Sequence, residues 1–228
     1  FVPLSEEERR QLQILYRRSN TRGGLQLGGH LLLLSLATFV VQQSLGGPGY
    51  FIAAFVLGGI MIFLFAPLHE CIHRTAFRTR KLNDIVATVT GFVLLLPPNY
   101  FRAFHLYHHR HTQIAEMDPE LADKKLDTPG QLLLHLSGYR YWRGNLAALG
   151  QHFLGRIKEP YISPLKVPAV ILEARYFVVS YALCLVVSLL TGSVVLATYW
   201  LIPILLGQPI LRLYLLAEHT LCPLTSDM

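Results

Sequence analysis

Four long apolar segments constrain this chain more than any other feature of its sequence. Residues 25–45 and 50–68 hold 21 and 19 residues without an Asp, Glu, Lys or Arg, and only Gly46-Gly47-Pro48-Gly49 lies between them. A helix needs about 20 apolar residues to cross a bilayer. A second pair covers residues 176–190 and 194–216. We therefore expect an all-α integral membrane protein with four transmembrane helices in two hairpins.

The composition agrees with a lipid environment. Hydrophobic residues make up 52% of the chain and charged residues 15%, whereas charged residues are about a quarter of an ordinary soluble domain. The net charge of +6 comes from basic residues beside the apolar segments, without a nucleic-acid recognition motif. This placement favours anionic lipid headgroups as partners. We find no internal repeat or appended soluble domain, and expect one membrane-embedded domain over residues 1–228.

The distribution of charge predicts which ends of the helices face the cytoplasm. Neither hairpin turn contains a charged residue, while Lys and Arg gather before the first hairpin, between the hairpins and at helix ends. The positive-inside rule then places these regions in the cytoplasm, in a bacterial inner membrane or the endoplasmic reticulum. Residues 84–98 hold only about a dozen apolar residues and should not cross. Residues 130–158 have the aromatic and cationic composition of interfacial helices.

Six of the ten histidines fall in two short windows beside the apolar segments. The first has His69 and His73 one helical turn apart, and the second has His105, His108 and His109 at a spacing that brings them to one helical face. Imidazole binds zinc, iron, copper and nickel, so the two windows predict a metal site. The other histidines receive weaker interpretations: His111 at the surface, His30 in an interhelical hydrogen bond, and His135 and His152 against headgroups.

Two metal chemistries compete for these residues. The first window reads His-Glu-x-x-His, which in zinc metalloproteases supplies two ligands and a general base, here Glu70. A catalytic zinc needs only three protein ligands, which leaves the second window without a role. The Glu-x-x-His pattern also occurs in soluble di-iron bundles, but those need a second copy on another helix, and the sequence has none. A histidine-rich di-iron site uses every clustered residue, and an intramembrane zinc metalloprotease stays as the alternative.

The two windows resemble the histidine boxes of membrane fatty acid desaturases and hydroxylases. The run from Arg102 to Thr112, followed by Asp118-Pro119-Glu120, is similar to the second box, and His69 to His73 is similar to the first. The resemblance extends over most of the chain. It implies two non-haem irons that activate O2, with six histidines as ligands: His69, His73, His105, His108, His109 and His219. It also makes Glu70, Asp118 and Glu218 candidates to orient the imidazoles.

The resemblance implies an O2-dependent di-iron oxidoreductase that introduces a double bond or a hydroxyl group into a fatty acyl or other lipid chain. No catalytic residue apart from the metal ligands is expected. The chain has no dinucleotide fingerprint, haem motif or iron–sulfur cysteine set. Electrons are therefore expected from a separate donor protein of the ferredoxin or cytochrome b5 type. A third histidine box of the family is absent, so we expect the natural protein to continue beyond residue 228.

Overall fold

The computed structural model of the chain describes residues 4–114, 116–122 and 126–219, and within these ranges it is helical. Its elements are, in chain order, α1 (Glu6–Leu15), α2 (Asn20–Gln43), α3 (Tyr50–Ile62), α4 (Phe65–His73), α5 (Arg80–Val93), α6 (Pro98–His111), the short 3-10 helix η1 (Pro119–Ala122), α7 (Pro129–Leu136), α8 (Tyr139–Phe153), α9 (Val167–Leu190), the π-helical turn η2 (Ala197–Leu201) and α10 (Ile202–His219).

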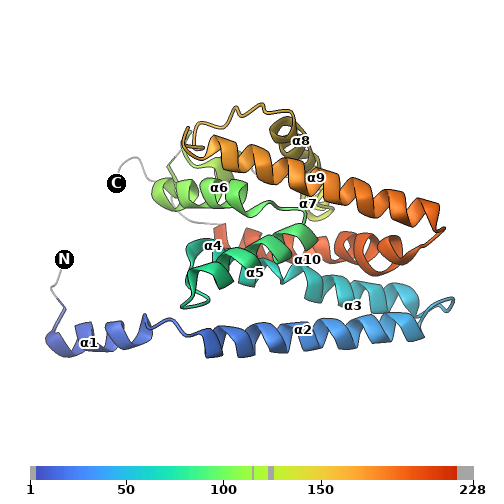
Figure 1. Cartoon of the computed structure of the whole chain (residues 1–228), viewed down its shortest axis with the longest axis horizontal. Helices are drawn as coiled ribbons and strands as arrows, with labels where there is room; N and C mark the ends of the chain where they lie inside the picture. Colours follow the sequence, from blue (N-terminus) through green and yellow to red (C-terminus); the bar gives the residue numbers. More distant parts are fainter. Residues whose placement is uncertain (1–3, 115, 123–125, 220–228) are drawn as a thin grey trace.

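Four helical segments are long and apolar enough to cross a membrane, which confirms the predicted number. They are Asn20–Gln43, Tyr50–His73, Val167–Leu190 and Ala197–Glu218. The second combines α3 with α4, and the fourth combines η2 with α10. Figure 1 shows the turns of both hairpins at one end of the molecule, with α4 and α6 toward the other end. The two predicted hairpins are therefore present, and the histidine-bearing helices lie away from their turns.

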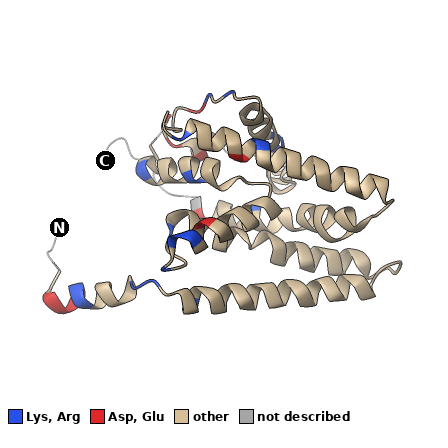
Figure 2. Ribbon diagram, viewed as in Figure 1, with Lys and Arg blue, Asp and Glu red and all other residues tan. Residues whose placement is uncertain are grey.

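Charged side chains are distributed as the sequence indicated. In Figure 2 they gather at the end that holds α4 and α6 and along the loops around α6 and α8, whereas the hairpin turns carry none. Burying a charge in hydrocarbon is costly unless it is paired. One end of the bundle is therefore suited to water and headgroups. Which compartment it faces stays a prediction.

The third helix of the four begins earlier than the hydrophobic run in the sequence. α9 starts at Val167 and not near residue 176, so it includes Glu173 and Arg175. Both charged side chains have partners: the Glu173 carboxylate accepts hydrogen bonds from Asn99, and Arg175 Nε donates to the Phe153 carbonyl at 3.2 Å. Pairing lowers the cost of including charged residues in the helix, and it ties the start of α9 to α6 and α8.

The short apolar segment between the histidine windows forms α5, which ends after 14 residues. A bend of 100° then separates α5 from α6. Gly91 permits the close return of the chain, because a Cβ at this position would lie 2.5 Å from the Leu96 carbonyl oxygen. Pro98 occupies the first turn of α6, where its missing N–H has no cost. α5 alone is too short to cross, and the bend directs α6 back toward α4.

α3 and α10 pack with their backbones in close contact. A Cβ on Gly58 would lie 1.9 Å from the carbonyl oxygen of Pro203, and one on Gly207 would lie 2.3 Å from the carbonyl of Gly58. Small residues at such crossings let membrane helices approach closely. The π-helical turn η2 directly precedes Pro203, where proline interrupts the regular hydrogen-bond ladder. This contact joins the two hairpins.

Replacing Gly58 by alanine should weaken the joint between the hairpins. The added methyl group overlaps backbone atoms that have no room to move, and overpacking of this kind costs roughly 1–3 kcal/mol. We expect the thermal unfolding midpoint to fall by several degrees, measured by fluorescence-detected size-exclusion chromatography. Gly28→Ala is the matched control, because a Cβ at Gly28 meets nothing within 4 Å. Equal unfolding midpoints for the two variants would contradict the proposed close packing.

Candidate metal centre

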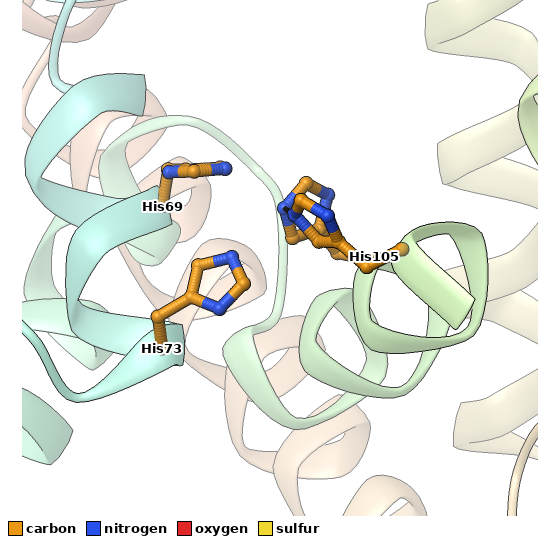
Figure 3. A group of neighbouring side chains, drawn as sticks. His69, His73 and His105 are labelled. Atoms are coloured by element: carbon orange, nitrogen blue, oxygen red, sulfur yellow. Dashed lines mark hydrogen bonds between the residues drawn. The ribbon is translucent and has the colours of Figure 1, made fainter. Parts of the chain in front are cut away.

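Four imidazoles from two helices converge at the charged end of the bundle. His69 and His73 lie one turn apart on α4, and His105 and His109 lie one turn apart on α6. Figure 3 shows the α4 pair directed across the gap toward His105. The ring centroids of His69 and His105 are 4.5 Å apart, and those of His73 and His109 are 4.9 Å apart. One ring nitrogen from each of the four lies within 4.8 Å of the others.

This arrangement fits a transition-metal ion. Metal–imidazole bonds are about 2.0–2.1 Å long, so two nitrogens bound to one ion lie at most about 4.2 Å apart. The observed cluster needs only small side-chain movements to meet that limit. His105 Nε2 and His109 Nε2 are already 2.8 Å apart. Burial, followed by the neighbouring imidazoles, lowers the pKa of His105 to about 2. The ring is therefore neutral near pH 7, as coordination requires.

A carboxylate on α5 links the two histidine-bearing helices. Asp84 accepts hydrogen bonds from Arg74, which follows α4, at 3.3 Å, and from Arg102 of α6 at 3.4 Å. Arg102 also donates to the Cys71 carbonyl oxygen at 3.2 Å, which connects α6 directly with α4. The Asp84 pairs are partly exposed, so each contributes little on its own. Together they set the relative position of the helices that carry the four imidazoles.

The N-terminus of α6 is held by a buried carboxylate from α9. Glu173 accepts from the Asn99 backbone N–H at 2.9 Å and from the Asn99 side-chain amide at 2.8 Å. The first N–H groups of a helix lack partners within the helix and carry partial positive charge, so a carboxylate there is favourable. Nothing in the sequence pairs these residues, because 74 positions separate them. α9 thereby fixes the start of the helix that presents His105.

His108 lies outside the group of four and has a different neighbourhood. Its Nδ1 is 2.8 Å from Asp118 Oδ1, and its Nε2 is 3.7 Å from Glu120 Oε2. Its ring centroid still lies 5.9 Å from that of His105 and 5.6 Å from that of His109, so His108 adjoins the group. Asp118 fixes which nitrogen of His108 faces outward, as carboxylates do for metal-bound histidines.

Glu70 is directed away from the space between the helices. Its carboxylate accepts a hydrogen bond from Thr75 Oγ1 at 2.6 Å and lies 3.3 Å from His69 Nδ1. The side chain is exposed and engaged at the C-terminal end of α4. A general base of a zinc protease would instead face the metal-bound water. The geometry therefore gives the protease alternative little support.

The remaining histidines have other contacts. His30 Nε2 lies 2.9 Å from the Ile60 carbonyl oxygen, which confirms the predicted interhelical hydrogen bond. His111 Nδ1 lies 3.0 Å from the carbonyl oxygen of Tyr107. The expectation of a headgroup contact for His152 is wrong: the ring is 1% exposed and its Nε2 lies 3.0 Å from Glu159. The helix α10 ends at His219, whose side chain lies outside the described residues.

Asp118→Asn should destabilise the segment that orients His108. Besides His108, the fully buried carboxylate of Asp118 accepts from the backbone N–H groups of Gln113 and Glu120, both at 2.9 Å. Burial raises the pKa of Asp118, but these hydrogen bonds outweigh burial and lower it overall. At pH 7 we expect a loss of about 1–3 kcal/mol in unfolding free energy. The measurement is thermal or denaturant unfolding, with the exposed Asp127→Asn as control.

The destabilisation by Asp118→Asn should depend on pH. Because the folded pKa of Asp118 lies below its unfolded value of about 3.9, its charge stabilises the fold above that pH. The stabilisation is lost as pH falls through the folded pKa. The difference between the original protein and Asp118→Asn should therefore be full at neutral pH and shrink in acid. A difference that is constant down to the acid limit of folding would contradict a charged Asp118.

The chain is similar to known proteins over the region that contains these features. The fatty acid desaturase family matches residues 46–226, which include both histidine windows and the second hairpin. No curated protein matches the chain. The family match covers well over half of the sequence and agrees with the four spans and the converging histidines. The chain therefore belongs to the fatty acid desaturase family.

Proposed function

We propose that this protein is a membrane-bound di-iron oxidoreductase that desaturates or hydroxylates a lipid acyl chain with O2. Membership of the desaturase family already implies an oxidoreductase. The observation that carries the finer proposal is the convergence of four imidazoles from α4 and α6. Iron is among the metals that imidazole ligands suit. An iron pair supplies O2 activation when bound, and every other part of the proposal concerns what this chain contributes.

The proposed ligands form two groups. His69, His73, His105 and His109 would hold one ion, since their nitrogens lie together between α4 and α6. His108 is proposed for the second position, since Asp118 holds its Nδ1 and its Nε2 lies 3.7 Å from Glu120 Oε2. His219 is proposed for the same centre. The chain thus positions the ions by anchoring two short helices to membrane spans.

The surroundings support a lipid substrate and a protein electron donor. The cluster lies at the charged end of a bundle with four apolar spans, which places it where an acyl chain in the bilayer meets the headgroup region. We propose that this end faces the cytoplasm, on the basis of its Lys and Arg residues. A ferredoxin or cytochrome b5 type of donor is proposed to dock there, since an acidic surface would complement the basic one.

The metal proposal predicts which histidine substitutions lower the iron content. Full-length protein should contain two irons per chain by elemental analysis, and His73→Ala should lose most of that iron because one of four neighbouring nitrogens is removed. His111→Ala is the control, since His111 contacts Tyr107 outside the cluster. Equal iron in both variants would remove His73 from the site. A single zinc with proteolysis abolished by Glu70→Gln would instead favour the protease alternative.

Activity is tested in cells or membranes that supply an electron donor. Full-length protein should produce new unsaturated or hydroxylated acyl chains, detected by gas chromatography–mass spectrometry of the lipids. The products should require O2 and disappear in His73→Ala but persist in His111→Ala. An iron-loaded protein that leaves every acyl chain unchanged, with a competent donor present, would contradict the proposed reaction.

A further inference from the structure

A second set of polar groups is buried between α8 and α10, apart from the histidine cluster. Gln208 of α10 is 0% exposed, and neither atom of its side-chain amide has a hydrogen-bond partner among the described residues. On α8, Trp142 Nε1 is also buried without a partner within that part of the chain, and Asn145 lies beside the Tyr141 hydroxyl. Buried polar atoms are nearly always hydrogen-bonded in folded proteins. Two unpartnered side chains on two facing helices therefore indicate a ligand that completes them.

Two close contacts fix how α8 and α10 face each other. Gly138, which precedes α8, has a φ of +69°, and a Cβ there would lie 2.4 Å from Gln208 Cγ. Trp142 and Asn145 follow Gly138 at helical spacing, so all three lie on the face toward α10. One turn beyond Gln208, the Arg212 guanidinium lies 4.2 Å from the centre of the Tyr141 ring. The polar groups of α8 thus face those of α10 over about one helical turn.

The N–H groups of this set favour a ligand that carries hydrogen-bond acceptors. Trp142, Asn145 and Gln208 present N–H donors, and Arg212 adds donors with a full positive charge. Groups rich in oxygen acceptors, such as a carboxylate or an acyl carbonyl, match such a set. An arginine inside a membrane-spanning helix is uncommon and typically functional. Trp142 also packs on the core that contains Phe101, one turn before His105. The polar set and the metal centre thus border the same hydrophobic core.

We propose that Gln208, Arg212, Trp142 and Asn145 bind the oxygen-bearing head of the acyl substrate, as a carboxylate or as an ester or thioester carbonyl. This inference rests on the proposed function, because it names the residues that hold one end of the acyl substrate. Carbons further along the same chain would lie at the metal centre. Head recognition at a fixed place determines which carbon is presented to the metal. The four side chains would then act in positioning and specificity and not in the chemical step.

Brominated fatty acids test the site without use of the reaction. Residues 1–228 hold two tryptophans, and replacing Trp200 and any tryptophan outside these residues by phenylalanine leaves Trp142 as the sole tryptophan for selective excitation. In full-length protein reconstituted in nanodiscs, 2-bromopalmitate should quench Trp142 saturably, because its bromine lies beside the carboxylate. 16-Bromopalmitate should quench far less. Unlabelled palmitate should restore the fluorescence. Restoration by methyl palmitate as well identifies the carbonyl as sufficient, and restoration by palmitate alone identifies the charged carboxylate.

Variants separate binding from folding. Gln208→Leu and Arg212→Gln should each weaken quenching by 2-bromopalmitate by on the order of tenfold, the loss expected for a hydrogen bond to a charged group. Arg143→Gln, on the exposed side of α8, should bind like the parent. Gln208→Leu removes an unpartnered buried amide, so its unfolding midpoint should stay unchanged or rise, whereas a purely structural Gln208 predicts a lower midpoint.

The outcomes for this site and for the proposed function are distinct. Equal quenching by the two bromine positions, or unchanged binding in both Gln208→Leu and Arg212→Gln, overturns the head-binding site even if the enzyme is active. Position-dependent quenching that both variants weaken supports the site. If that result is accompanied by an iron-loaded protein without O2-dependent products, the proposed reaction fails and the binding site stands.

Discussion

The sharp turn between α5 and α6 is the constraint on which the site depends. α4 ends a membrane span, and α6 could approach it only if the intervening apolar helix stopped short and the chain came back. Gly91 allows the close return, and Pro98 begins α6 in the required direction. A full crossing by residues 84–98 would have put the two histidine windows on opposite faces of the membrane. The length of one apolar segment thus decides whether a shared metal centre is possible.

Polar interactions then hold α4 and α6 in the positions that the turn allows. Asp84 connects Arg74 and Arg102, and Glu173 holds the first turn of α6 from a different span. Pairing and hydrogen bonding lower the cost of charged side chains in and beside apolar helices. The same balance applies to Gln208 and Arg212, which belong to a spanning helix but face α8. Glu173 and Arg175 are tolerated in α9 because they have partners, whereas the Gln208 amide has none among the described residues.

The sequence predicted the spans and the paired histidines because both follow simple periods. Apolar runs report the thickness of the bilayer, and a spacing of four places His69 beside His73 and His105 beside His109. His108 adjoins His105 and His109, but its place outside the group of four could not be predicted, because it depends on the contacts of its nitrogens with Asp118 and Glu120 in the folded chain. The apolar residues before Arg175 indicated that this arm is longer than residues 176–190, but the pairing of Glu173 with Asn99 was missed, since only the folded chain brings them together.

The α8–α10 set was outside the reach of sequence reasoning for a related reason. Residues 130–158 showed an interfacial composition, and nothing in the sequence connected them with Gln208. Their relation depends on Gly138 meeting Gln208 across 70 positions of the chain. Contacts of this kind are specified by the packing of whole helices and leave no local pattern.

The central claim is that histidines from both α4 and α6 bind the same metal centre. X-ray absorption at the iron edge of full-length, iron-loaded protein measures this directly, through the number of imidazole nitrogens near 2.1 Å. The account predicts a histidine-rich first shell whose imidazole scattering falls when His73 of α4 is replaced, and falls again when His109 of α6 is replaced. A spectrum that is unchanged by either substitution, or a shell dominated by oxygen or sulfur, would contradict it.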